Sequence, residues 1–145
     1  MYGAVWPTME LAGGMRIKSR GSDSMANSSD VRILVVEDEY LIRMLLEDML
    51  GDVGYSVSAA VGTIAEASKL AEAGDFELAI LDVNLDGEPI YPVADILAKN
   101  GKPFVFVTGY GESSLAEPYR DRPALQKPFQ AEQLQKALAA LLATA

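Results

Sequence analysis

Residues 31–39 read VRILVVEDE, a short apolar run that ends in three acidic residues. Because its apolar residues are continuous rather than alternating, the run predicts a strand buried on both faces of a parallel sheet. Residues 41–50 then place Leu, Ile and Met at spacings of three and four, which is the period of an amphipathic helix. The regular part of the chain therefore begins with a strand, an acidic turn and a helix.

The same alternation of strand and helix continues along the chain. We expect strands at 55–60, 76–81, 103–107 and 124–126, and helices at 63–73, 90–100 and 131–142. Thr63 is expected to cap the second helix, and Gly51 and Gly54 to end the first. Such a chain predicts an α/β fold, a doubly wound (βα)5 flavodoxin-like parallel sheet with strand order 2-1-3-4-5.

The segment between the fourth and fifth strands is the weakest repeat. About two helical turns fit between Thr108 and Lys127, and Pro118 and Pro123 shorten what can form there. We expect a fourth helix that is short or irregular.

The residue composition excludes several kinds of site and binding partner. The 145 residues allow one domain, and the absence of Cys and His excludes disulfides, thiolate metal sites and a histidine base. Lys and Arg number 12 against 21 Asp and Glu, a net charge of −9, so we expect no nucleic-acid partner and no binding to anionic membranes. No apolar run reaches the ~18–20 residues of a membrane span, and we expect a cytoplasmic protein.

Residues 1–30 differ from the rest of the chain. They carry four Met and several Gly and Ser without sustained periodicity, which predicts a disordered N-terminal extension before a domain at 31–145. Pro7 and Glu10 interrupt any apolar core, so the extension is not typical of a signal peptide. One hypothesis is that translation starts at Met25, and the intact mass of the protein purified from its source tests it.

Polar residues stand where the predicted strands end: Glu37 and Asp38, Asp82, Thr108 and Lys127. In an open α/β sheet, ligands bind beyond the carboxyl ends of the strands, so we expect these side chains to converge. Carboxylates on adjacent strands suit Mg²⁺, and beside the metal Asp82 would act as the nucleophile of a phosphoryl transfer. Thr108 would hydrogen-bond one phosphoryl oxygen and Lys127 would pair with another. No general base is needed, because a carboxylate is ionised at neutral pH.

Each of these features alone also has an ordinary structural explanation. Acidic residues such as Glu37 and Asp38 are favoured at a helix N-terminus, and Asp82 and Asn84 are common loop formers. A Thr-Gly pair is common in turns, and a single Lys is usually a solvated surface residue. Their joint occurrence at successive strand ends favours one phosphoryl-transfer site.

On these residues the sequence resembles the receiver domains of bacterial two-component response regulators, over about residues 31–143. The matching segments are ILVVEDE at 33–39, LDVNL at 81–85 and KPF at 127–129. The resemblance implies that residues 31–145 form a receiver domain and that Asp82 is its phosphorylated residue.

The resemblance also implies roles for the surrounding residues. Asp38 and Asp82 would contact Mg²⁺ directly, Asn84 would offer its backbone carbonyl, and Glu37 would act largely through water. Thr108 would be the hydroxyl switch residue, and Lys127 would pair with the phosphorylated side chain.

Three shorter segments are similar to a narrower group, the stand-alone receivers of α-proteobacteria: GEP at 87–89, FVTGYG at 106–111 and LQKP at 125–128. Some of these carry a Phe-Ala-Thr-Gly-type motif, in which Val107 here replaces the Ala. The family often couples the Thr hydroxyl to an aromatic residue three positions before the Lys, where this chain has Ala124. Our hypothesis is that phosphorylation instead orders residues 109–123 by drawing Thr108 inward.

The function that the resemblance implies is that of a single-domain response regulator receiver. Asp82 would accept a phosphoryl group from a sensor histidine kinase or a histidine phosphotransfer protein and switch a surface that binds a downstream protein partner. No enzyme activity beyond slow self-dephosphorylation is expected. An output regulator, a relay intermediate and a phosphate sink all remain open roles.

Two other functions compete with this one. Asp82-Val83-Asn84 loosely resembles the paired-acid motif of aspartyl-nucleophile phosphatases, but Asn84 replaces the second acid and no cap domain fits. A phosphorylation-independent receiver-like adaptor is the alternative that Ala124 keeps open.

Overall fold

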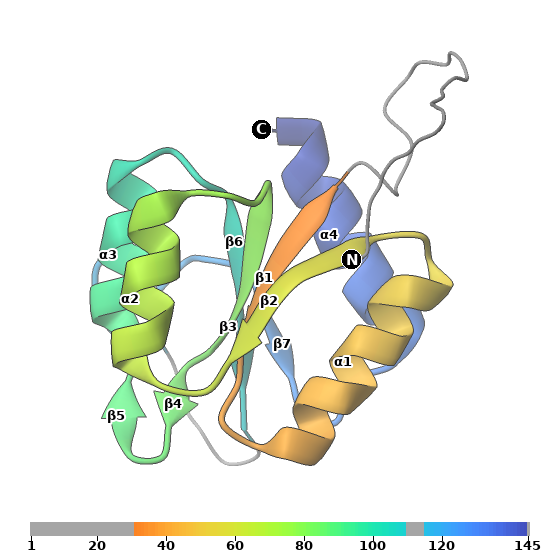
Figure 1. The fold of residues 1–145 in the computed structure, drawn as a ribbon, viewed down its shortest axis with the longest axis horizontal. Helices are drawn as coiled ribbons and strands as arrows, with labels where there is room; N and C mark the ends of the chain where they lie inside the picture. Colours follow the sequence, from red (N-terminus) through yellow and green to blue (C-terminus); the bar gives the residue numbers. More distant parts are fainter. Residues whose placement is uncertain (1–30, 110–114, 145) are drawn as a thin grey trace.

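The computed structural model describes residues 31–109 and 115–144, and a five-stranded parallel sheet forms its central layer (Figure 1). The sheet strands are β1 (Arg32–Val36), β2 (Ser56–Val61), β3 (Leu78–Asp82), β6 (Phe104–Thr108) and β7 (Ala124–Gln126). Their order is β2-β1-β3-β6-β7. The two remaining strands, β4 (Asn84–Leu85) and β5 (Glu88–Pro89), form a separate antiparallel hairpin. Without that hairpin the order is the predicted 2-1-3-4-5, which is confirmed.

Four helices cover the sheet in two layers: α1 (Tyr40–Asp52), α2 (Ile64–Ala73), α3 (Tyr91–Lys99) and α4 (Ala131–Thr144). Helices α1 and α4 lie on one face, and α2 and α3 on the other (Figure 1). Alternate residues of β1 enter the two cores, since Leu34 and Val36 pack towards α2 and α3 while Ile33 and Val35 pack towards α1 and α4. Burial on both faces explains why β1, β3 and β6 are nearly continuous apolar runs.

Of the predicted helix ends, the start of α2 agrees with the structure and the end of α1 differs from it. The Thr63 hydroxyl accepts a hydrogen bond from the Glu66 backbone N–H at 3.2 Å, so the predicted N-cap of α2 is confirmed. The prediction that Gly51 ends the first helix is wrong, because α1 continues through Gly51 to Asp52. The residue with left-handed backbone is Gly54, with φ of 92°, and there the chain turns towards β2.

The segment before β7 contains turns and no helix over its described residues, 115–123. Tyr119 is buried and packs against the rings of Tyr91, Phe104 and Phe106. Its hydroxyl donates a 2.6 Å hydrogen bond to the carboxylate of Asp95 on α3. Aromatic packing rather than a regular helix thus holds residues 115–123, in agreement with the expected irregular fourth helix.

Two expectations concern parts of the chain that the description does not reach. The predicted N-terminal extension, residues 1–30, lies outside the described residues, as do residues 110–114 of the predicted fourth repeat. Among the described helices, none has both the length and the apolar character that a bilayer crossing requires.

Candidate functional site

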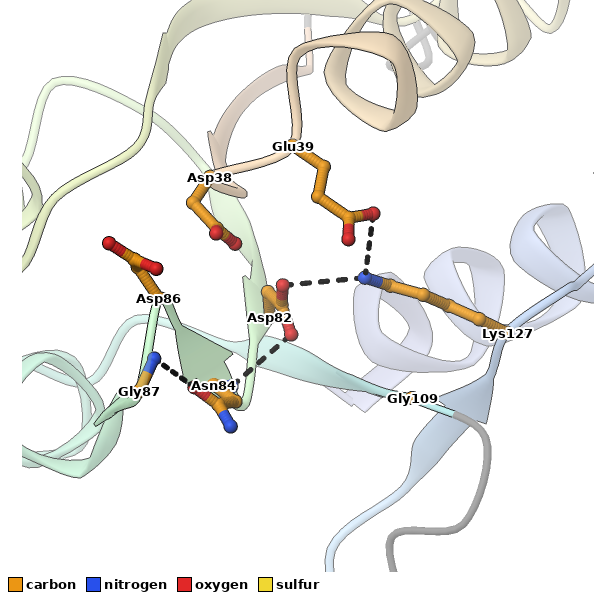
Figure 2. Close-up of a pocket in the computed structure, with 8 residues that line it drawn as sticks. All are labelled: Asp38, Glu39, Asp82, Asn84, Asp86, Gly87, Gly109 and Lys127. Carbon is orange, nitrogen blue, oxygen red and sulfur yellow. Dashed lines mark hydrogen bonds and ion pairs between the residues drawn. The ribbon is translucent and has the colours of Figure 1, made fainter.

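The carboxyl ends of the sheet strands surround a pocket of about 300 Å³ (Figure 2). Residues from four segments meet there: the turn after β1, the end of β3 with its hairpin, the loop after β6 and the loop after β7. The lining residues are Asp38, Glu39, Asp82, Asn84, Asp86, Gly87, Gly109 and Lys127. The pocket therefore lies where the sequence placed it, at the edge shared by parallel strands.

Asp82 is the last residue of β3 and lies at the centre of this pocket. It is buried, with 4% of its surface exposed. Its Oδ1 accepts a 3.2 Å hydrogen bond from the Asn84 backbone N–H. Burial and the neighbouring Glu37 carboxylate raise the pKa of Asp82 to about 7. This pKa lies above the ordinary range of a carboxyl, and a cation bound in the pocket would lower it.

Glu37 and Asp38 enter the site from the end of β1. Glu37 is 1% exposed, its Oε1 accepts a 3.0 Å hydrogen bond from the Glu39 backbone N–H, and its own N–H donates to Val61 on β2. Glu37, Asp38 and Asp82 each offer a carboxylate oxygen, and these oxygens lie within 4.8 Å of one another. Hard oxygen donors at this spacing fit Mg²⁺, whose charge would offset their mutual repulsion.

Lys127 supplies the positive charge of the pocket. Its ammonium nitrogen lies 3.0 Å from Glu37 Oε2, 3.4 Å from Asp82 Oδ2 and 3.9 Å from Glu39 Oε1. Burial alone would lower the pKa of Lys127, but the hydrogen bond to Glu37 and the charges of Asp82 and Glu37 outweigh it and raise the pKa. Lys127 therefore stays protonated in the pocket.

Thr108 and Asn84 occupy less direct positions than the carboxylates and Lys127. The Thr108 hydroxyl lies 3.5 Å from the Leu125 carbonyl on β7, and Thr108 is not among the residues that line the pocket. The Asn84 side chain accepts a 2.6 Å hydrogen bond from the Gly87 N–H within the hairpin. The structure thus brings Glu37, Asp38, Asp82 and Lys127 together, with Asn84 at the rim and the Thr108 hydroxyl bonded towards β7.

Two carboxylates in the pocket were missed by sequence reasoning, Glu39 and Asp86. Asp86-Gly87 between short extended segments is a recognised signal for a two-residue hairpin turn. That signal would have placed Asp86 beside the strand end at Asp82. Ala124, by contrast, is exposed and pairs in register with Phe106 on β6.

Comparisons with known proteins agree with this geometry. The response regulator receiver domain model matches residues 33–139. The transcriptional regulatory protein PdtaR of Mycobacterium tuberculosis is 39% identical over 104 residues, which are 68% of this chain and 50% of PdtaR. The chain thus spans about half the length of this relative.

Solved structures of SdrG are similar over most of the described fold. SdrG from Sphingomonas melonis Fr1 is 50% identical with a TM-score of 0.71, covering 77% of this chain and 96% of that chain. The BeF3-activated conformation of SdrG from Pseudomonas melonis Fr1 is 47% identical with a TM-score of 0.67, covering 81% and 99%. The fold, the pocket and these matches agree, and the chain belongs to the response regulator receiver domain family of two-component systems.

Proposed function

We propose that Asp82 accepts a phosphoryl group with the help of Mg²⁺ and that this modification switches a protein-binding surface. One observation carries the proposal: Asp82 is buried, and the carboxylates of Glu37 and Asp38 and the Lys127 ammonium surround it. Such a site holds a nucleophile, metal ligands and a cation for a phosphoryl oxygen. On this proposal the protein is a phosphoacceptor switch rather than an enzyme, with slow self-dephosphorylation at most.

The chemistry of the transfer follows from these residues. An Asp82 carboxylate oxygen forms a bond to phosphorus while the bond from phosphorus to the donor atom breaks and the donor keeps that electron pair. Asp38, Asp82 and the Asn84 backbone carbonyl would hold Mg²⁺, and Glu37 would act through water. The bound ion would supply positive charge that neutralises the phosphoryl oxygens and favours the ionised form of Asp82. Lys127 lies 3.4 Å from Asp82 and is in position to pair with a phosphoryl oxygen.

An apolar surface beside the pocket supports a protein as phosphoryl donor. Helix α1 exposes Tyr40, Leu41, Met44 and Leu45, with Leu41 76% exposed. A groove of about 290 Å³ continues this surface and is lined by Ile42, Leu45, Pro128 and Phe129 together with Lys127 of the pocket. Contiguous apolar area of this kind is typical of an interaction site. A sensor histidine kinase or a histidine phosphotransfer protein docked there would hold its phosphohistidine over Asp82, in the cytoplasm.

For the switch we propose that Thr108 changes its hydrogen-bond partner. The 3.5 Å separation between its hydroxyl and the Leu125 carbonyl is long, so a phosphoryl oxygen on Asp82 would compete well for this donor. The movement of Thr108 would order residues 109–123, and a downstream partner would bind the ordered segment. Amide exchange of that segment with and without beryllofluoride tests the proposal, and unchanged protection would contradict it.

A phosphorylation-independent adaptor is the second candidate. The exposed Ala124, where the family often has an aromatic residue, and the Thr108 hydroxyl bonded to β7 favour it. An adaptor would bind its partner equally well whether or not Asp82 can be modified.

Acetyl phosphate with Mg²⁺ separates the two candidates. The phosphoacceptor is expected to gain about 80 Da, the mass of one phosphoryl group, and to lose this gain in Asp82→Asn. Asp48→Asn, which changes an exposed carboxylate on α1, serves as the matched control and should keep the gain. A wild-type protein that gains no mass, or an Asp82→Asn protein that still does, would overturn the proposal. A pull-down that compares wild type with Asp82→Asn then identifies partners that depend on phosphorylation.

A further inference from the structure

The β4–β5 hairpin places a carboxylate at the mouth of the pocket. Asp86 and Gly87 form its two-residue turn with φ of 51° and 91°, as a type I′ turn requires. The Asn84 side chain closes the turn with its 2.6 Å hydrogen bond from the Gly87 N–H. The Ile90 N–H donates to the Val83 carbonyl and ties the base of the hairpin. Asp86 is therefore held at a fixed place beside the end of β3.

No side chain among the described residues neutralises the charge of Asp86. Among the described residues its carboxylate makes no hydrogen bond and no ion pair, although the residue lines the pocket. Lys127 is already shared by Glu37, Asp82 and Glu39. In the view of Figure 2, Asp86 rises from the hairpin on one side of Asp82 and Lys127 reaches in from the other. An anion bound at Asp82 thus shares the pocket with a negative charge that no side chain among the described residues neutralises.

We propose that Asp86 is a specificity-determining residue that disfavours small, highly charged phosphoryl donors at the Asp82 site. The inference rests on the proposed phosphoacceptor function and adds to it the class of donor. A free dianion such as acetyl phosphate gains nothing outside the pocket to offset repulsion by Asp86. A phosphohistidine on a protein gains apolar contacts on α1 that do offset it. Asp86 thereby slows phosphorylation by small free donors, without abolishing it, and favours a donor that docks.

The step itself is the same for every donor. The Asp82 oxygen bonds to phosphorus, and from acetyl phosphate the P–O bond breaks and acetate leaves with the electron pair. From phosphoramidate the P–N bond breaks and the nitrogen leaves as ammonia after taking a proton. The two donors differ in charge, because acetyl phosphate is a dianion at neutral pH and phosphoramidate carries less net negative charge. The ratio of variant to wild-type rate, taken for each donor and then compared, cancels the difference in leaving group and reports the electrostatic effect.

The test uses Asp86→Asn in the full chain. Asn is tolerated at left-handed backbone and Asn-Gly is a favoured type I′ turn, so the hairpin is retained. Glu88→Gln on β5 is the matched control, since it removes an exposed carboxylate of the same hairpin that does not line the pocket. Phosphorylation rates are followed by intact mass at saturating Mg²⁺, with saturation checked by titration for each variant.

We expect Asp86→Asn to be phosphorylated by acetyl phosphate about fivefold faster than wild type at low salt, with a smaller gain for phosphoramidate. The gain with acetyl phosphate should shrink to less than about twofold at about 0.5 M salt, because salt screens a surface charge. Glu88→Gln should stay close to wild type for both donors.

The outcomes separate this inference from the function on which it rests. If wild type gains mass but Asp86→Asn is no faster, is slower, or gains equally with both donors, the role of Asp86 is wrong and the phosphoacceptor function stands. A gain that persists at high salt, or that Glu88→Gln reproduces, also overturns the role. If wild type gains no mass with either donor, the proposed function itself fails.

Discussion

The ammonium nitrogen of Lys127 lies 3.0 Å from Oε2 of Glu37, and this ion pair joins the loop after β7 to the end of β1. These two strands are not neighbours, because β3 and β6 lie between them in the sheet. The pair spans the pocket in front of Asp82, which Lys127 also contacts at 3.4 Å. One cation therefore compensates two buried carboxylates, and the site is held together electrostatically before any ligand binds.

Removal of the Lys127 charge should destabilise the fold. In Lys127→Gln, Glu37 and Asp82 are left buried without a counter-charge, and breaking a fully buried pair costs about 3–5 kcal/mol. We expect a smaller loss, about 2 kcal/mol, because 19% of the Lys127 side chain is exposed. Urea unfolding at pH 8 without metal measures this difference. Lys136→Gln, at an exposed lysine of α4, is the control, and an equal loss in both variants would refute the interpretation.

The raised pKa of Asp82 predicts a pH dependence of stability. The folded protein holds this proton up to about pH 7, whereas the ordinary value of the group is 3.8. Between these two values the folded state binds more protons than the unfolded state, so the free energy of unfolding should fall as pH rises. Urea titrations in EDTA from pH 5 to 8 measure the slope. Asp82→Asn should flatten it and Asp48→Asn should not, while a wild-type stability that rises over this range would count against the assignment.

Mg²⁺ should reverse this loss. A cation bound to the folded carboxylate cluster stabilises it by mass action, and protons compete with the cation for the same oxygens. The increase in unfolding free energy on adding Mg²⁺ should therefore be larger at pH 8 than at pH 5 and should shrink in Asp38→Asn. Equal gains at both pH values would indicate that the metal binds elsewhere.

Tyr119 should stabilise the segment before β7 through two separable contributions. Tyr119→Phe removes the hydroxyl bonded to Asp95 and should cost about 1 kcal/mol. Tyr119→Ala also removes the ring that packs on Phe104 and Phe106 and should cost about 3 kcal/mol or more. Thermal or urea unfolding measures both. Tyr55→Phe is the control. If it lowers the free energy of unfolding as much as Tyr119→Phe does, the hydrogen bond to Asp95 is not the cause of the loss.

The Thr63 cap gives a local prediction. Thr63→Ala removes the acceptor of the Glu66 N–H and should destabilise the protein by about 1 kcal/mol. Thr63→Ser keeps a hydroxyl and should restore most of this stability. Urea unfolding compares the two variants, and equal losses would mean that the methyl group rather than the cap is responsible.

The sequence by itself determined the sheet and the edge at which the site lies. The apolar runs before Glu37 and Asp82 must be buried on both faces, and parallel strands bring their carboxyl ends, together with that of the short strand before Lys127, to one edge. The meeting of these side chains at one edge follows from that constraint. A single residue such as Gly51 predicted the end of a helix less well. A helix interior tolerates a glycine when the residues around it continue the helix.

Only the tertiary structure decided the electrostatics of the site and the place of Asp86. The pKa of Asp82 depends on its burial and on the nearby Glu37 carboxylate, and the partners of Lys127 depend on the reach of its side chain from the end of β7 to Glu37. The segment before β7 is held by ring packing around Tyr119 between residues distant in sequence. These are long-range contacts that no periodicity encodes, whereas the alternation of strand and helix is encoded locally in residue spacing.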